Sequence, residues 1–148
     1  MITRKHTLIV AFAICAVAFL ALGASQENVE RPFKIEGNVT VTINLTNGHM
    51  TSVDWGESTH CGRYLNQGTG RMNPAGGFIQ NGTGTCANGD QLFWTQQNTH
   101  VVFTGGTGRF ENVKGGFEYV PFDTVATEDD PNTRILTFKY HGVGTVSY

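Results

Sequence analysis

The stretch FKIEGNVTVTINLT, residues 33–46, alternates between two kinds of residue without exception. Its odd-numbered positions are apolar or glycine, and its even-numbered positions are charged residues, Asn or Thr. Because successive side chains of a β-strand point to opposite faces, this period of two predicts a long strand with one face in a core and the other in water. Asn47-Gly48 follows directly and is typical of a tight hairpin turn.

The rest of the chain is expected to continue as short strands and turns. A second strand is predicted over Met50–Leu65, with bends at Gly56 and Gly62. After it we expect a loop over Asn66–Gly77, strands over Phe78–Ala87, Gln91–Gln97, His100–Thr104 and Arg109–Val120, a loop over Pro121–Asn132, and a last strand or pair of strands over Thr133–Tyr148. No amphipathic helix interrupts this pattern. The sequence therefore predicts an all-β fold, a single antiparallel barrel of about eight strands, because closure removes exposed strand edges.

Length and charge exclude several classes of protein. The 148 residues suit one domain, and 10 Lys and Arg against 12 Asp and Glu give a formal charge of −2. This balance disfavours a nucleic-acid partner, which normally meets a basic surface. The 19 glycines lack the regular repeat of collagen, so we interpret them as turn and strand-bend residues.

The N-terminus has the pattern of a secretory signal peptide. Arg4 and Lys5 precede the uncharged run of residues 8–23, which ends in small residues and is short for a membrane span. Cleavage after Gly23 divides the chain into a signal peptide, residues 1–23, and a barrel domain, residues 24–148. The product is expected to be secreted or periplasmic, with no membrane segment after cleavage; an uncleaved N-terminal anchor is the alternative.

Cysteine usage agrees with an oxidising compartment. Cys15 belongs to the expected signal peptide, which leaves Cys61 and Cys86. An even number of cysteines in an exported domain favours a disulfide between them, and two buried free thiols are the alternative. Zinc is disfavoured because no ligand spacing accompanies the two cysteines.

A glycine-rich segment first suggests a nucleotide site. VVFTGGTGRF, residues 101–110, places an apolar strand before TGGTG, but a dinucleotide-binding turn requires a helix next. Gly115-Gly116 disfavours that helix. We therefore interpret Gly105, Gly106, Gly108 and Arg109 as a structural turn between two strands, and expect no cofactor.

The same segment carries a resemblance. FTGGTGRFENVKGGF (103–117), STHCGRY (58–64), TGTCANGDQLFW (83–94) and FKYHGVGTVSY (138–148) resemble small secreted proteins of the allene oxide cyclase-like and dirigent-like β-barrel class. The resemblance implies a calycin-like, allene oxide cyclase-like barrel. In those relatives the positions of Cys61 and Cys86 are more often apolar, which strengthens the expectation of a disulfide. The resemblance does not imply an enzyme activity, because the functional residues of the plant proteins cannot be matched one by one to positions in this sequence.

Few polar residues stand out as a site. His60 and Arg63 would bind an anionic or carbonyl group if Gly62 marks a bulge that places them on one face; otherwise they are surface residues. Asp90 either presents a carboxylate at the barrel rim or begins a strand after the Asn88-Gly89 turn. Arg109 either binds an anion at the turn or pairs with a carboxylate and clamps the turn.

The aromatic residues either line an apolar cavity or fill the barrel. We predict that Trp55, Trp94 and Tyr140 contact a ligand together with His60 and Arg63. No catalytic set and no metal ligands are recognisable.

Three functions follow. The first is a non-catalytic barrel that binds a small apolar or amphipathic ligand. The second is a cyclase or isomerase of the allene oxide cyclase kind, and the third is an extracellular structural or interaction protein. The lumen discriminates among them: an apolar cavity favours the first, a cavity with buried acidic or basic groups favours the second, and a filled lumen with an exposed apolar patch favours the third.

Overall fold

The structure, a computed structural model, describes residues 29–148. The predicted signal peptide over residues 1–23 lies outside the described residues, and so does Cys15. Among the residues described, no helix is long and apolar enough to cross a membrane.

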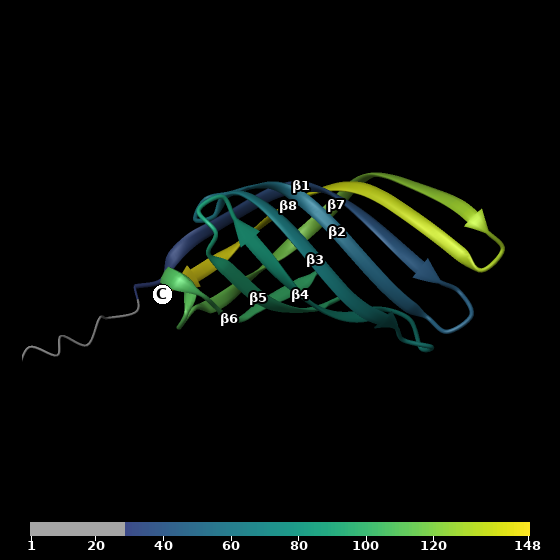
Figure 1. The fold of residues 1–148 in the computed structure, drawn as a ribbon, viewed down its shortest axis with the longest axis horizontal. Helices are drawn as coiled ribbons and strands as arrows, with labels where there is room; N and C mark the ends of the chain where they lie inside the picture. Colours follow the sequence, from purple (N-terminus) through teal and green to yellow (C-terminus); the bar gives the residue numbers. More distant parts are fainter. Residues whose placement is uncertain (1–28) are drawn as a thin grey trace, which may run out of the picture.

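The chain forms one closed antiparallel barrel (Figure 1). Each strand pairs with the next along the sequence, and β1 closes the barrel by pairing with β8. The strands are β1 (Arg31–Asn44), β2 (His49–Ser58), β3 (Gly62–Met72), β4 (Phe78–Cys86), β5 (Gln91–Gln97), β6 (His100–Gly106), β7 (Lys114–Asp130) and β8 (Thr133–Ser147), and a single turn of 3-10 helix, η1 (Gly108–Phe110), lies between β6 and β7. The predicted fold class, a single all-β antiparallel barrel of about eight strands, is confirmed.

Strand β1 has the two faces that its sequence predicts. Phe33, Ile35, Val39, Val41 and Ile43 are buried, whereas the residues between them are exposed or half-buried. The strand ends at Asn44, so Leu45 lies in the turn and is exposed. Burial of the five apolar side chains gives β1 its place in the barrel wall, because each removes apolar surface from water.

The predicted second strand over Met50–Leu65 is wrong, because two strands occupy that region. β2 ends at Ser58 and β3 begins at Gly62, whose φ of +65° belongs to the left-handed region that glycine adopts readily.

The predicted loop over Asn66–Gly77 is also wrong, since β3 runs to Met72. The glycines of this region leave space for a neighbour instead of ending the strand. A Cβ at Gly68 or at Gly82 of β4 would overlap the ring of Trp94, which lies against both positions. Glycine inside these strands is therefore a packing requirement.

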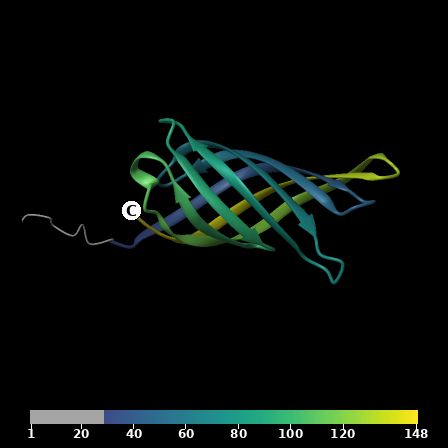
Figure 2. The same ribbon diagram turned by 60° about the horizontal axis from the view of Figure 1, so that its bottom comes forward.

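Strands β7 and β8 form a long hairpin that projects past the rest of the barrel (Figures 1 and 2). β6 pairs with β7 only from His100 to Val102, whereas β7 stays paired with β8 as far as Asp130. The predicted loop over Pro121–Asn132 is therefore wrong, because pairing with β8 keeps most of it extended. At the other end, β7 begins at Lys114 and not at Arg109, because η1 occupies residues 108–110.

Candidate functional site

The barrel encloses a cavity of about 380 Å³ with mainly apolar walls. All eight strands contribute to its lining. The aromatic residues therefore do not fill the lumen, which was the alternative that the sequence left open. A cavity of this size falls within the range of small-molecule sites, roughly 300–1,000 Å³.

One end of the lumen is closed by packed aromatic rings. The ring of Phe33 lies 5.2 Å from that of Phe103 and 5.4 Å from that of Phe117, measured between centroids. Phe110 of η1 is fully buried nearby and meets the ring of Tyr148 edge to face. This end also carries the C-terminus (Figure 1).

The opposite end is the mouth. There the cavity lining includes Met72, which is 40% exposed, and the exposed residues Thr99, Pro121 and Thr124. The connections β1–β2, β3–β4, β5–β6 and β7–β8 lie at this end, where the β7–β8 hairpin projects (Figure 2). The cavity is therefore open between hairpins at one end and bounded by packed aromatic rings at the other.

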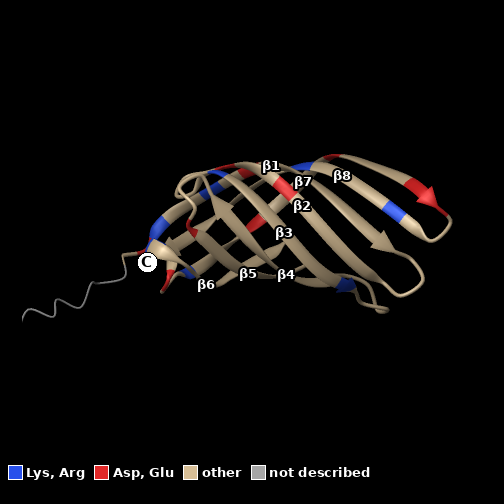
Figure 3. Cartoon of the chain, viewed as in Figure 1, with Lys and Arg blue, Asp and Glu red and all other residues tan. Residues whose placement is uncertain are grey.

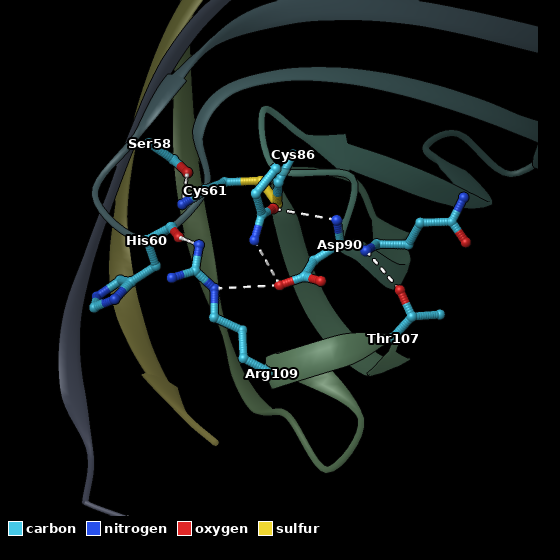
Figure 4. Close-up of a disulfide and its surroundings, with 9 residues drawn as sticks. Ser58, His60, Cys61, Cys86, Asp90, Thr107 and Arg109 are labelled. Carbon is cyan, nitrogen blue, oxygen red and sulfur yellow. Dashed lines mark hydrogen bonds and ion pairs between the residues drawn. A yellow bond between two sulfur atoms is a disulfide. The ribbon is translucent and has the colours of Figure 1, made fainter.

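A disulfide joins Cys61 to Cys86 at the closed end, as predicted (Figure 4). It connects the turn between β2 and β3 with the end of β4, across a sequence separation of 25 residues. The alternative of two buried free thiols is thereby excluded.

Arg109 lies beside the disulfide and bridges two turns (Figure 4). Its guanidinium donates a hydrogen bond to the carbonyl of His60, and its Nε lies 3.6 Å from Asp90 Oδ2. Asn88 also donates to Asp90 Oδ2, and the amide of Gln91 donates to Thr107 Oγ1. These are the contacts expected of a clamped structural turn, and they leave Arg109 engaged with protein groups.

A buried carboxyl lies in the middle of the lumen. Asp54 on β2 is only 7% exposed. Its Oδ1 accepts a hydrogen bond of 2.8 Å from Asn66 Nδ2 and one of 2.9 Å from the hydroxyl of Tyr140 on β8. Burial raises the pKa of Asp54 to about 6, since desolvation disfavours the charged form more than these two hydrogen bonds favour it.

Two tyrosines extend this cluster. The hydroxyl oxygens of Tyr64 and Tyr140 are 2.6 Å apart, and Tyr64 also donates to the carbonyl of Glu36 at 3.1 Å. Burial raises the pKa of both phenols far above the ordinary value, and the charge of Asp54 raises the pKa of Tyr140 further. Both therefore stay protonated whenever Asp54 titrates.

The number of protons limits these contacts when Asp54 is ionised. Tyr140 then donates to Asp54 Oδ1, and Tyr64 has one proton for two acceptors, the hydroxyl of Tyr140 and the carbonyl of Glu36. A buried carboxyl with a raised pKa that is held in this way is a candidate for proton transfer.

A second group of polar side chains lines the lumen between this cluster and the mouth. Ser52 donates to Gln80 Oε1 at 3.2 Å, and Gln80 Nε2 donates to Gln96 Oε1 at 2.6 Å. Gln96 in turn donates to the hydroxyl of Tyr119 at 2.7 Å. Burial raises the pKa of Tyr119 to about 12. These residues carry no charge at neutral pH, so they offer dipoles to a ligand.

The structure separates the five residues expected to contact a ligand. Trp94 and Tyr140 line the cavity. Trp55 is 48% exposed on the outer surface, and Arg63 is exposed and pairs loosely with Glu57. His60 lies outside the cavity lining, where its ring contacts the carbonyl of Pro32 and the hydroxyl of Tyr148. Gly62 therefore does not bring His60 and Arg63 onto one ligand-binding face.

Sequence reasoning missed Asp54, Tyr64 and Asn66 as a site. The signal that would have found Asp54 is the pairing of β2 with β1, in which Val41 faces Ser52 and Val39 faces Asp54. Partners across two strands share one face, so the buried face of β1 places Ser52 and Asp54 in the lumen. The apolar Val53 and Trp55 then point outward, against the usual pattern.

Metal binding has no support among the described residues, where no three His, Cys, Asp or Glu side chains gather in a geometry that would hold an ion.

Two solved structures of other proteins share this fold. No family model matches the chain, and no curated protein matches it. Two solved structures of pterocarpan synthase dirigent proteins are similar. GePTS1 has a TM-score of 0.51 and 14% identity, over 80% of this chain and 86% of that one. PsPTS1 has a TM-score of 0.53 and 16% identity, over 83% of this chain and 98% of that one. At this identity the likeness concerns the backbone alone. The chain thus folds as a dirigent-like β-barrel, an eight-stranded antiparallel barrel, in agreement with the resemblance in its sequence.

Proposed function

We propose that this barrel binds a small, largely apolar ligand in its lumen and holds the ligand by a hydrogen bond to Asp54. The observation that carries the proposal is a cavity of about 380 Å³ with apolar walls, an exposed mouth and a single buried carboxyl. Sites of this composition bind through apolar area and orient the ligand through a few polar groups.

Fluorescence tests the proposal, because the chain contains two tryptophans and only Trp94 lines the cavity. The variant Trp55→Phe leaves Trp94 as the reporter. Titration with the neutral probe N-phenyl-1-naphthylamine is expected to give saturable one-to-one binding, with enhanced probe emission and quenched Trp94 emission.

A matched pair of variants separates the lumen from the outer surface. Val41→Phe places a larger side chain in the lumen, and Thr42→Phe places the same side chain on the outer face of the same strand. Binding is expected to be lost in Val41→Phe and kept in Thr42→Phe, with both variants folded by circular dichroism. Equal binding by the two variants, or no binding by the parent, contradicts the proposal.

A second candidate is an acid–base enzyme, such as a cyclase or isomerase. It is favoured by the buried Asp54 with its pKa of about 6 and by the hydrogen bond from Tyr140 that holds this carboxyl in the lumen. The two structures named above are described as pterocarpan synthase dirigent proteins, so a barrel of this fold serves as a synthase in those two proteins.

A reactive probe tests this candidate without knowledge of the substrate. In 5-nitrobenzisoxazole a base removes the ring C–H proton, the electron pair forms a nitrile, and the N–O bond breaks to release a coloured phenolate. Asp54 as the base predicts a rate that rises with pH through about 6 and disappears in Asp54→Asn. An unchanged rate in Asp54→Asn contradicts general-base action by this carboxylate.

Export remains part of the proposal. The disulfide is compatible with an oxidising compartment, and the predicted cleavage after Gly23 agrees with it. N-terminal sequencing of the protein from the medium or periplasm of an expressing cell is expected to begin at Ala24. Retention of the whole chain inside the cell contradicts the prediction.

A further inference from the structure

The charge of the lumen is carried by one residue. Among the described residues that line the cavity there is no Lys, Arg or His, and Asp54 is the one carboxyl. The tyrosines that line it, Tyr64, Tyr119 and Tyr140, all have a pKa raised by burial and stay neutral at physiological pH. A ligand in the lumen therefore meets a negative or neutral site, and meets no positive one.

Four cations of the barrel pair with carboxylates outside the cavity lining. Arg109 pairs with Asp90 at the closed end, and Arg63 points into solvent beside Glu57. On the projecting hairpin, Arg134 lies 3.2 Å from Glu128 and Lys139 lies 3.1 Å from Asp123. Figure 3 shows both basic and acidic residues on the projecting β7–β8 hairpin.

The two oxygens of Asp54 have different surroundings. Oδ1 accepts from both Tyr140 and Asn66, which holds the carboxyl in place. No residue in the described part of the chain donates a hydrogen bond to Oδ2, and the residue lines the cavity. Oδ2 is therefore the atom that remains for a ligand, and a hydrogen-bond donor is the group that it accepts.

We propose that the lumen selects its ligand by charge: it accepts an apolar skeleton that carries an amine or a hydroxyl, and it rejects the corresponding carboxylate. This inference rests on the proposed binding function and specifies the ligand class for the same cavity. A carboxylate would lose its water without gaining a cation, and it would lie near a second negative group. An ammonium or hydroxyl instead donates to Oδ2, and the ammonium adds charge complementarity.

Three ligands of equal chain length test the inference. Decylamine, decanol and decanoate are titrated at pH 7.5 against the barrel loaded with N-phenyl-1-naphthylamine. We expect decylamine and decanol to displace the probe and decanoate to bind about 100-fold more weakly than decanol, because a buried unpaired charge is strongly disfavoured. Equal displacement by decanol and decanoate overturns charge selection while the proposed binding function stands. Failure of the probe itself to bind overturns the binding function.

Two variants assign the selection to the lumen carboxyl. In Asp54→Asn, which keeps the shape of the side chain, decylamine is expected to bind about tenfold more weakly and decanoate about tenfold more tightly, since the interaction with one buried charge is gone. Glu57→Gln removes a carboxylate on the outer face of the same strand and is expected to change neither affinity. Unchanged affinities of decylamine and decanoate in Asp54→Asn overturn the assignment, and the wild-type titrations test the selection itself whether or not the variant folds.

Discussion

Tyr140 donates a 2.9 Å hydrogen bond to Asp54 across the lumen, between residues 86 positions apart in the sequence. The two strands that carry them, β8 and β2, are not neighbours, because β1 lies between them. On β1 the lumen position next to this contact is Gly37, where a Cβ would overlap the hydroxyl of Tyr64. The missing side chain of Gly37 thus makes room for the tyrosine pair that supports the carboxyl.

The first prediction concerns stability and pH. The pKa of Asp54 is about 6 in the fold, against an ordinary value of 3.8, so the folded state binds this proton more tightly. The contribution of Asp54 to stability is therefore fully present below pH 4 and is lost as the pH rises to about 6, with a loss of about 3 kcal/mol in the free energy of unfolding. Urea unfolding of the parent and of Asp54→Asn between pH 4 and 8 measures the difference. Parallel pH profiles would show that Asp54 titrates normally.

The second prediction concerns Gly37. Gly37→Ala introduces a methyl group where the hydroxyl of Tyr64 and the carbonyl of Trp55 already lie. We expect a loss of about 2–3 kcal/mol in stability, because overpacking forces neighbouring groups to move. Asn38→Ala, at the adjacent outward position, is the control and is expected to have a small effect.

A double-mutant cycle assigns part of that loss to the tyrosine. Tyr64→Phe removes the hydroxyl that the new methyl group meets, so Gly37→Ala is expected to cost about 1 kcal/mol less in that background. An equal cost in both backgrounds would assign the whole effect to the backbone contact with Trp55.

The fold was predictable because its signals are local. The alternation of residues 33–46 identified the long strand and its buried face, and Asn47-Gly48 identified the hairpin that follows. The glycine-rich segment around Gly68 was misjudged because glycine favours turns when only neighbouring residues are considered. The need for glycine at position 68 becomes clear only in the folded barrel, where the ring of Trp94 from another strand packs against it.

The site was less predictable, because it depends on register. Trp94 and Tyr140 were expected to contact a ligand and do line the cavity, but nothing in the sequence indicates that Tyr140 meets Asp54. Trp55 was grouped with them because large apolar side chains usually lie inside. On β2 the polar Ser52 and Asp54 occupy the inner face, and only pairing with β1 reveals this inversion.

The third prediction concerns the disulfide. Replacing Cys61 and Cys86 by Ala removes a crosslink with a sequence separation of 25 residues, and we expect a loss of about 3 kcal/mol because the unfolded chain gains freedom. Urea unfolding with and without reductant measures it. Reductant should lower the stability of the parent toward that of the variant and leave the variant unchanged. If the stability of the parent does not change although the disulfide is fully reduced, this account is contradicted.

The last prediction concerns the pair formed by Arg109 and Asp90. Their side chains are 43% and 22% exposed, so solvent screens the 3.6 Å contact, and the coupling energy in a double-mutant cycle is expected to be only about 0.5–1 kcal/mol. Arg109→Ala should lower the free energy of unfolding by more than this coupling energy. The guanidinium also donates to the carbonyl of His60 and thereby connects η1 to the turn before β3. Salt at 1 M should reduce the coupling energy. It should leave the rest of the stability loss in Arg109→Ala nearly unchanged, since salt screens exposed charges more than hydrogen bonds to the backbone. A coupling as large as the whole cost of Arg109→Ala would mean that the ion pair alone holds the turns together.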